Sequence, residues 1–161
     1  MKKKDTIFAL ASGPGKSAIN IIRISGPSSI KVINSLSASK NHKQREAKLT
    51  KIFSGSGELI DQTITTIYKK PKSYTGEDMA EISTHGGNAV VKKLFDELKK
   101  IPMLRLAKPG EFTRRAFENN KLELTQVEAI ADIVNSETEM QRKQAISHLS
   151  GFFFYQIKKN F

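Results

Sequence analysis

The sequence contains no cysteine and no apolar run long enough to cross a membrane. Without cysteine, the chain itself has no disulfide, no thiolate metal site and no cysteine nucleophile. A helix that spans a bilayer needs about 18–20 consecutive apolar residues. We therefore expect a cytoplasmic protein with no membrane partner, and no metal site in this chain.

Signatures of catalysis are also missing, because neither a serine–histidine–aspartate order nor an HExxH spacing is present. We accordingly predict no catalytic residue. One stretch resembles a nucleotide-binding loop, since Gly15-Lys16-Ser17 matches the end of the pattern G-x-x-x-x-G-K-[ST]. The first glycine of that pattern would fall on Leu10, and a strand-like segment follows where the motif needs a helix. We interpret the stretch as a tight connection between two strands.

Positive charge is what the sequence has in excess, with 27 lysines and arginines against 16 acidic residues and a net charge of +11. Such an excess concentrates polyanions near a protein, so RNA or an acidic ligand is a candidate partner. A lysine-rich, solvated surface explains the same count. Aromatic residues that would stack on bases are sparse outside residues 152–161. Left uncovered, that aromatic segment would be an apolar patch prone to association.

Most of the chain has the pattern of an α+β domain, in which hairpins and helices are mixed. We expect strands over 6–11, 18–25, 49–53, 59–68 and 79–84, and helices over 27–36, 88–100 and 111–118. A helical segment follows a domain boundary near Leu122. Capping boxes predicted at 125–128 and 136–139 indicate either two helices or one long kinked helix.

Two charged residues lie in segments that otherwise read as buried strands. Arg23 sits among isoleucines and needs an anionic partner, which is either a protein carboxylate or a carboxylate or phosphate of a ligand. Glu81 is costly to bury without a partner. It either faces solvent or accepts hydrogen bonds from two adjacent N–H donors, as on a pterin or a guanine.

Three further positions have weaker signals. His85, beside two glycines, is either a ligand or general base or a structural residue where a strand passes into a helix. Lys121 lies at the predicted domain junction and is, by itself, an ordinary surface lysine. The turn at residues 73–78 holds two carboxylates, fewer ligands than a metal ion requires.

A set of short motifs occurs along the chain in one fixed order. They are Asp5-Thr6-Ile7, Pro14-Gly15, Ile22-Arg23-Ile24-Ser25-Gly26, Tyr74-Thr75-Gly76-Glu77-Asp78, Glu81, His85-Gly86-Gly87, Ala107-Lys108-Pro109-Gly110-Glu111-Phe112-Thr113, Arg115-Ala116-Phe117, Asn119, Lys121-Leu122 and Gln126-Val127-Glu128-Ala129-Ile130-Ala131-Asp132. Each motif is weak evidence, but the ordered set is specific. From residue 5 to about residue 151, the sequence resembles the N-terminal part of the MnmE (TrmE) family of tRNA modification GTPases.

The resemblance implies a mixed sheet with helices, similar to folate-binding aminomethyltransferase-like domains, followed by a helical segment. Residues 1–121 would form a domain that binds a tetrahydrofolate derivative, such as the 5-formyl or 5,10-methylene form, and that makes a homodimer. Residues 122–161 would begin a helical domain. The folate-contacting arginine, glutamate and lysine of the family fall on Arg23, Glu81 and Lys121.

The resemblance also implies a role in tRNA modification. With the flavoprotein MnmG, the family adds an aminomethyl-type group to C5 of the wobble uridine of tRNA. GTP, potassium and magnesium would bind in a GTPase domain that is missing from these residues, so we expect no GTP hydrolysis by this chain alone. The alternative is a non-catalytic basic domain that binds RNA or a protein, with its folate pocket unused. A divergent aminomethyltransferase-like folate enzyme is disfavoured, because the segment after Leu122 matches the GTPase family instead.

Overall fold

The computed structural model of the chain describes residues 5–13, 15 and 17–150. Residues 14 and 16 of the nucleotide-loop-like stretch, and the aromatic segment 152–161, lie outside the described residues. The chain forms two compact units, residues 1–112 and 113–161, each held together by contacts among its own residues. Each unit is described by itself below.

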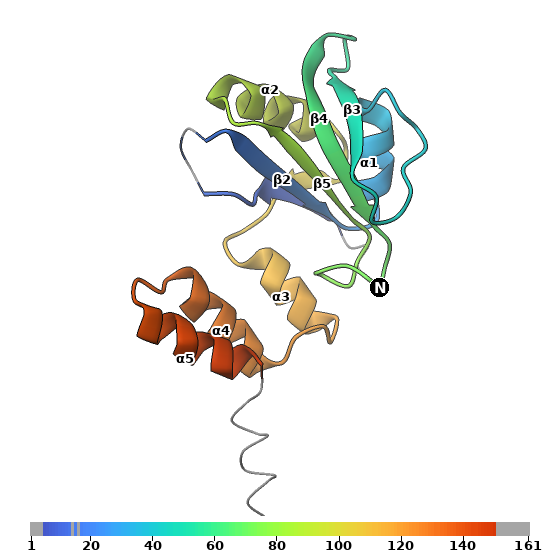
Figure 1. Cartoon of the computed structure of the whole chain (residues 1–161). Helices are drawn as coiled ribbons and strands as arrows, with labels where there is room; N and C mark the ends of the chain where they lie inside the picture. The colour runs from blue at the N-terminus through green and yellow to red at the C-terminus, as the bar shows by residue number, and fades with distance from the viewer. Residues whose placement is uncertain (1–4, 14, 16, 151–161) are drawn as a thin grey trace, which may run out of the picture. The chain divides into compact units, whose positions relative to one another are not determined.

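A six-stranded sheet forms the framework of the first unit, in the order β3-β4-β5-β2-β1-β6 (Figure 1). Its strands are β1 (Thr6–Leu10), β2 (Ile19–Ser25), β3 (Lys48–Phe53), β4 (Leu59–Tyr68), β5 (Met79–His85) and β6 (Leu104–Leu106). All neighbouring strands are antiparallel except β1 and β6, which are parallel. The sheet is therefore mixed, which confirms the predicted α+β class.

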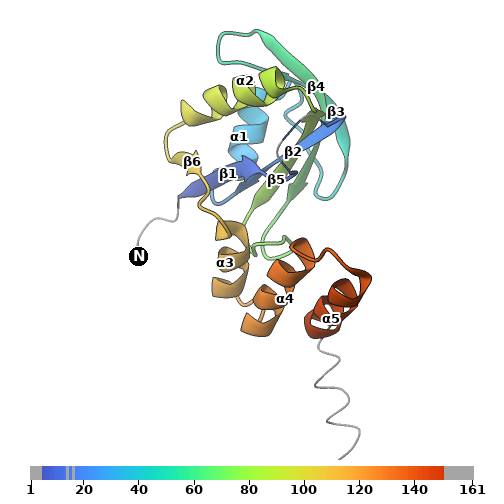
Figure 2. The same cartoon turned by 90° about the vertical axis from the view of Figure 1, so that its left-hand side faces the viewer.

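Two helices, α1 (Ser29–Leu36) and α2 (Asn88–Lys99), cover one face of this sheet (Figure 2). Because side chains alternate along a strand, Ile22, Ile24 and Ile82 point toward the helices and are fully buried. Leu94 and Leu98 of α2 are buried in the same core. Burial of such side chains contributes about 1.5–3 kcal/mol each.

The opposite face, which we call the open face, carries the intervening residues of the same strands. Arg23 pairs with Glu81 in the register of β2 and β5. At the far end of these strands, Gly86 lies so close to the start of β2 that a Cβ atom there would stand 1.7 Å from the carbonyl oxygen of Ser17. Glycine is required at this position because any side chain would collide with the backbone of Ser17.

The predicted elements of the first unit are present, and one strand was not predicted. A strand does follow Ser17, as predicted, and begins at Ile19. The three-residue strand β6 was not predicted, because its short sequence Leu104–Leu106 has no periodicity to recognise. It forms because the backbone groups on the outer edge of β1 are available for hydrogen bonding to it.

Helix α3 (Glu111–Glu118) spans the boundary between the units, and α4 (Leu124–Val134) and α5 (Glu139–Leu149) follow. The segment after Thr125 is thus two helices, packed on the buried side chains of Ala129 and Ala145. None of the helices that the structure describes combines the length and apolar composition needed to cross a membrane.

Both predicted capping boxes were misplaced by two residues. The first begins at Glu123, whose backbone N–H donates to the side-chain oxygen of Gln126 at 2.9 Å. The second begins at Thr138, whose hydroxyl accepts the N–H of Gln141 at 3.2 Å, while the Gln141 side chain accepts from Thr138 N–H. Glutamine closes both boxes, and the predicted boxes had used glutamate at that place.

Candidate functional site

The centre of the candidate site is an ion pair on the open face. Both Nε and Nη2 of Arg23 lie 2.8 Å from Oε1 of Glu81. The two side chains are partly exposed, at 27% and 19%. The sequence left open whether Arg23 pairs with a protein carboxylate or with an anionic group of a ligand. In this structure it pairs with a protein carboxylate, that of Glu81.

Tyr68, near the end of β4, completes the polar group. Its hydroxyl donates to Oε2 of Glu81 at 3.3 Å. Burial raises the pKa of the Tyr68 hydroxyl, and the negative charge of Glu81 raises it further. The hydroxyl therefore stays protonated as a donor. A carboxylate can accept about four hydrogen bonds, so the long bond from Tyr68 leaves Oε2 with unused acceptor capacity.

Two aromatic rings border the pair. The guanidinium carbon of Arg23 lies 5.1 Å from the ring centre of Tyr74 and 5.7 Å from that of Phe112, within the range of cation–π attraction. Both residues belong to segments that carry the family resemblance, but nothing in the sequence predicted that either touches Arg23. The site thus combines a carboxylate, a guanidinium and flat apolar surfaces.

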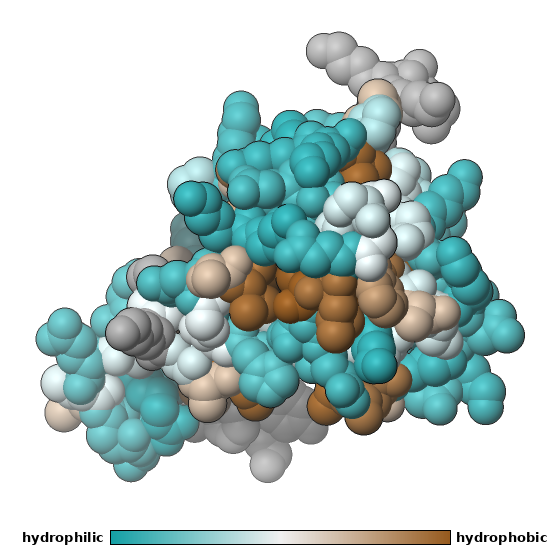
Figure 3. Space-filling model, turned by 90° about the horizontal axis from the view of Figure 1, so that it is seen from above, coloured by the Kyte–Doolittle hydropathy of each residue, from teal (hydrophilic) through white to brown (hydrophobic). Residues whose placement is uncertain are grey.

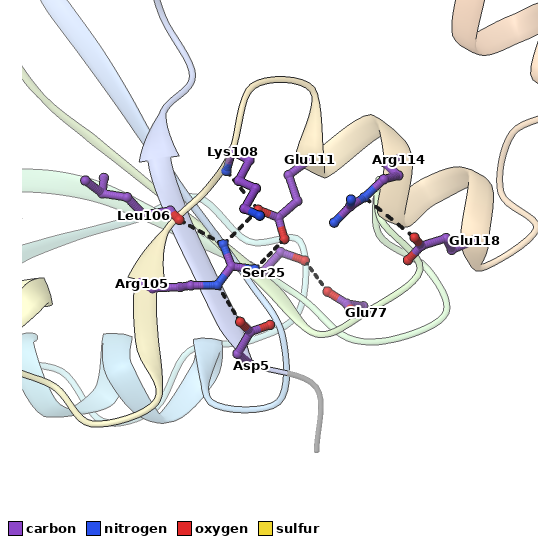
Figure 4. Close-up of polar contacts among 9 residues, drawn as sticks. All are labelled: Asp5, Ser25, Glu77, Arg105, Leu106, Lys108, Glu111, Arg114 and Glu118. Carbon is purple, nitrogen blue, oxygen red and sulfur yellow. Dashed lines mark hydrogen bonds and ion pairs between the residues drawn. The ribbon is translucent and has the colours of Figure 1, made fainter. Parts of the chain in front are cut away.

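A second ion cluster fixes the chain just before Phe112 (Figure 4). Arg105 of β6 binds Glu111 through two nitrogens, at 2.6 and 2.9 Å, and its Nε donates to Asp5. The backbone N–H of Lys108 donates to the same Glu111 carboxylate at 2.8 Å. Glu111, and then Asp5, raise the pKa of the Arg105 guanidinium above its ordinary value.

This cluster holds the start of α3 against β6. Glu111 is 2% exposed and occupies the first turn of α3, where a carboxylate is also favoured by the helix dipole. Because Phe112 is the next residue, the cluster positions the ring that lies beside Arg23. Neither the pairing nor its effect on Phe112 was predicted, since β6 itself was not.

The two carboxylates of the turn at 73–78 accept hydrogen bonds that stabilise the turn. Glu77 accepts a hydrogen bond from the buried hydroxyl of Ser25 at 2.8 Å, and Ser25 also bonds Thr75 at 2.7 Å. Asp78 accepts the backbone N–H of Lys70 at 2.9 Å. These contacts tie the turn to the end of β2.

His85 lies at the opposite end of the open face from Arg23. Its Nδ1 is 2.8 Å from Oδ1 of Asp61, and its backbone N–H donates to Oδ2 of the same residue at 2.9 Å. The ring is 72% exposed. Asp61 thus holds His85 in place where β5 ends, which favours a structural role at the passage from strand to helix.

Next to His85, a shallow cavity of about 320 Å³ lies on the open face, lined by three apolar side chains together with polar ones such as Gln62 and Ser83. Ile19, Leu49 and Ile64, which we call the apolar patch, are 61%, 63% and 46% exposed. Leu49 and Ile64 are direct partners across β3 and β4. Apolar side chains surrounded by hydrophilic ones are visible at the molecular surface in Figure 3. A patch of this kind is typical of an interaction surface.

Lys121, the third predicted site residue, belongs to the second unit. Its side chain is exposed, and its backbone N–H donates to the carbonyl oxygen of Ala116 at 2.8 Å. The structure therefore brings together Arg23 and Glu81 within the first unit, while the role predicted for Lys121 stays a prediction.

Comparison with known proteins identifies the family. Residues 6–121 match the family described as "GTP-binding protein TrmE N-terminus". The chain belongs to this family. The TrmE resemblance drawn from the ordered motifs is thereby confirmed over most of the sequence.

Several relatives are named "tRNA modification GTPase MnmE". The chain is 48% identical to that of Dinoroseobacter shibae over 91% of its own residues, and 52% identical to that of Hyphomonas neptunium over 94%. The protein from the Wolbachia symbiont of Brugia malayi is 46% identical over 94%. Each match covers 34% of the relative, so the chain spans about a third of the length of these proteins.

Proposed function

We propose that this chain is the tetrahydrofolate-binding and dimer-forming portion of a tRNA modification GTPase. The domain would extend to residue 121, with a helical domain beginning at 122. Its folate would be the 5-formyl or 5,10-methylene derivative, which supplies a one-carbon unit. The observation that carries this proposal is the Arg23–Glu81 pair among aromatic rings.

The residues present fit a pterin ring. A pterin presents two adjacent N–H donors on one edge, and a carboxylate is their matching acceptor. Glu81 has one acceptor position left on Oε2, because Arg23 occupies Oε1 and Tyr68 makes a single long bond to Oε2. Accepting both pterin donors would require the ligand to displace the weak Tyr68 bond. The rings of Tyr74 and Phe112 supply flat surfaces of the kind that bind planar ligands. Arg23 and Lys121 would favour polar or anionic parts of the cofactor.

We propose the function of the whole assembly from the activity of the family. Together with the flavoprotein MnmG, it would add an aminomethyl-type group to C5 of the wobble uridine of tRNA in the cytoplasm. The chain covers about a third of its relatives, and GTP, potassium and magnesium would bind outside that third. We therefore expect this chain to hydrolyse no GTP by itself.

The proposed homodimer is supported by the apolar patch. Ile19, Leu49 and Ile64 lie on the face that α1 and α2 do not cover, and each is about half exposed or more. A second copy of this chain would bury these side chains and so gain free energy from the hydrophobic effect.

The folate proposal is tested by titrating the purified chain with 5-formyltetrahydrofolate in a calorimeter. We expect saturable binding by the wild type, and about 10- to 100-fold weaker binding by Glu81→Ala, because a hydrogen-bonded charged group is lost. Arg23→Ala should also weaken binding. A folded wild-type chain without saturable binding would refute the proposal.

The matched control is Glu58→Ala. Glu58 is an exposed carboxylate that also pairs with a cation, Lys93, at 2.7 Å, but it lies at the turn between β3 and β4. Its removal should leave folate affinity unchanged. Equal losses in Glu58→Ala and Glu81→Ala would show that the effect is not specific to the site.

A further inference from the structure

Two loops of the first unit gather positive charge at one end of the sheet. The first precedes β3, and the second follows β4 (Figure 1). Their exposed cations, which we call the basic rim, are Lys40, Lys43, Arg45, Lys69, Lys70 and Lys72. Glu46 is the one exposed acidic residue in the loop before β3.

Direct contacts join the two loops into one surface. The backbone N–H of Arg45 donates to the carbonyl oxygen of Ile67 at 2.9 Å, and Gln44 forms a parallel bridge with the same residue. The Arg45 guanidinium donates to the carbonyl oxygen of Lys72 at 3.1 Å. The cations of both loops therefore lie along a continuous edge.

Within the described residues, the cations of the basic rim have no carboxylate partners, as is also true of Lys31, Lys92 and Lys99 on the helices. The rim differs from those three lysines because its cations lie on two loops that contact each other directly. Elsewhere Lys93 pairs with Glu58, and Lys100 pairs with Glu97, each at 2.7 Å. Unpaired like charges repel one another, and a polyanion relieves that repulsion while its counterions are released. The rim side chains are exposed and are distributed over two loops, which favours an extended polyanion over a small anion.

Residues of the rim are close neighbours in sequence of residues in the candidate site. Lys69 directly follows Tyr68, whose hydroxyl bonds Glu81. Lys72 precedes Tyr74 by two residues, and the Tyr74 ring contacts Arg23. A polyanion held on the rim would therefore pass next to Glu81.

We propose that the basic rim binds the phosphate backbone of tRNA and so brings a nucleotide to the Arg23–Glu81 site. This inference rests on the proposed function, because that function makes tRNA the substrate and places the one-carbon donor at Glu81. Phosphate contacts of this kind position a nucleic acid without reading its sequence.

The test uses the full chain and an unmodified tRNA transcript that has a wobble uridine. Fluorescence anisotropy measures affinity between about 50 and 200 mM KCl. The triple variant Lys69→Gln, Lys70→Gln, Lys72→Gln should bind tRNA more weakly. The slope of the logarithm of its binding constant against the logarithm of the salt concentration should decrease in magnitude by about 3, one for each lost phosphate contact. Its affinity for 5-formyltetrahydrofolate should stay close to that of the wild type.

A matched triple variant removes the same charge from the helical face, at Lys31→Gln, Lys92→Gln and Lys99→Gln. All three lysines are exposed on α1 and α2. We expect it to retain the wild-type slope. Equal losses in the two triple variants, or no tRNA binding by the wild type, would overturn the role of the rim. Binding of tRNA that depends on the rim, without any folate binding, would support the rim and refute the proposed folate function.

A second measurement needs no variant. Acetylation of the wild-type chain, followed by mass spectrometry, should show that tRNA protects Lys69, Lys70 and Lys72. Lys92 and Lys99 should react at the same rate with and without tRNA. Uniform protection of all lysines, or protection of none, would contradict the proposal.

Discussion

The two ends of the open face are built from the same strands but carry opposite chemistry. At one end, Arg23, Glu81 and Tyr68 form a hydrogen-bonded polar group. At the other end, Ile64 and its neighbours in the apolar patch surround a shallow cavity. On β4, Ile64 and Tyr68 are four residues apart and share a face, because side chains alternate along a strand.

We propose that this sheet face separates two tasks. The polar end suits a ligand with hydrogen-bond donors, and the apolar end suits a protein surface. If the two tasks are independent, substitutions at one end should leave the property of the other unchanged. Each prediction below is a way to test that separation.

The largest effect is expected for Ile64→Asp. A carboxylate buried in the proposed dimer interface would be costly to desolvate, so the dimer should dissociate with a constant about 100-fold higher. Sedimentation velocity over a range of concentrations measures this. Folate affinity should be unchanged, because Glu81 and Arg23 are untouched.

Leu106→Asp is the control for that experiment. Leu106 is 44% exposed, against 46% for Ile64, but it lies on the far edge strand β6. Dimerisation should survive this change. A monomeric wild-type chain, or equal dissociation of both variants, would contradict the assignment of the apolar patch.

A smaller effect is expected for Arg105→Ala. Arg105 does not contact Arg23 or Glu81 itself, but it holds Glu111 and so positions Phe112 beside Arg23. Glu111 would lose its guanidinium partner while remaining 2% exposed. Because Arg105 itself is partly exposed, we expect a loss of about 2 kcal/mol in the free energy of unfolding, below the range for fully buried pairs. Folate binding should weaken as well, since Phe112 loses its fixed position. Chemical denaturation and calorimetry measure the two effects.

Arg142→Ala provides the comparison for Arg105. Arg142 also binds a carboxylate through two nitrogens, but its partner Glu139 is exposed on α5. An exposed pair contributes little to stability because solvent screens the two charges, so the unfolding free energy should change little. If both variants lost the same stability, the cluster at Arg105 would not be the anchor that we describe.

The smallest effect concerns the titration of Tyr68. Its folded-state pKa is raised, so the contribution of the protonated hydroxyl to stability is fully present below the unfolded pKa of about 10 and is lost as the pH rises through the folded pKa. Glu81→Gln removes a charge that raises this pKa, and should therefore shift the Tyr68 titration to lower pH. Phenolate absorbance measures the shift, with Tyr68→Phe to identify the signal.

In the same titration, Glu58→Gln should leave the Tyr68 curve in place, because Glu58 belongs to the turn between β3 and β4. A Tyr68 curve that is the same in the wild type and in Glu81→Gln would mean that Glu81 does not act on the hydroxyl. The interaction between Glu81 and Tyr68 would then be weaker than the distance between them indicates.

Much of this arrangement could be predicted from local sequence. A high content of isoleucine and other apolar residues indicated β2, and an arginine and a glutamate within apolar strands made Arg23 and Glu81 candidate site residues. What local sequence could not supply was their pairing, which depends on the register between β2 and β5 across a long stretch of chain. Register is set by matching the hydrophobic patterns of the two strands and by the geometry of their connection, so the residues next to Arg23 do not determine it alone.

The aromatic neighbours of Arg23 illustrate the same limit. Phe112 reaches the site because Glu111 is held by Arg105, and Arg105 lies on a strand too short to have a sequence signal. Similarly, the capping boxes of α4 and α5 were misplaced because several nearby residues could cap a helix, and packing selects among them.

The parallel pairing of β1 with β6 has a consequence for synthesis of the protein. β1 is made first, yet its outer edge is covered when Leu104–Leu106 pairs with Thr6–Phe8. A ribosome must therefore release almost the whole first unit before the sheet can close. Until then the nascent chain carries an unpaired strand edge, the feature most prone to wrong association during folding. Chaperone engagement with this nascent chain should persist until β6 emerges and then fall.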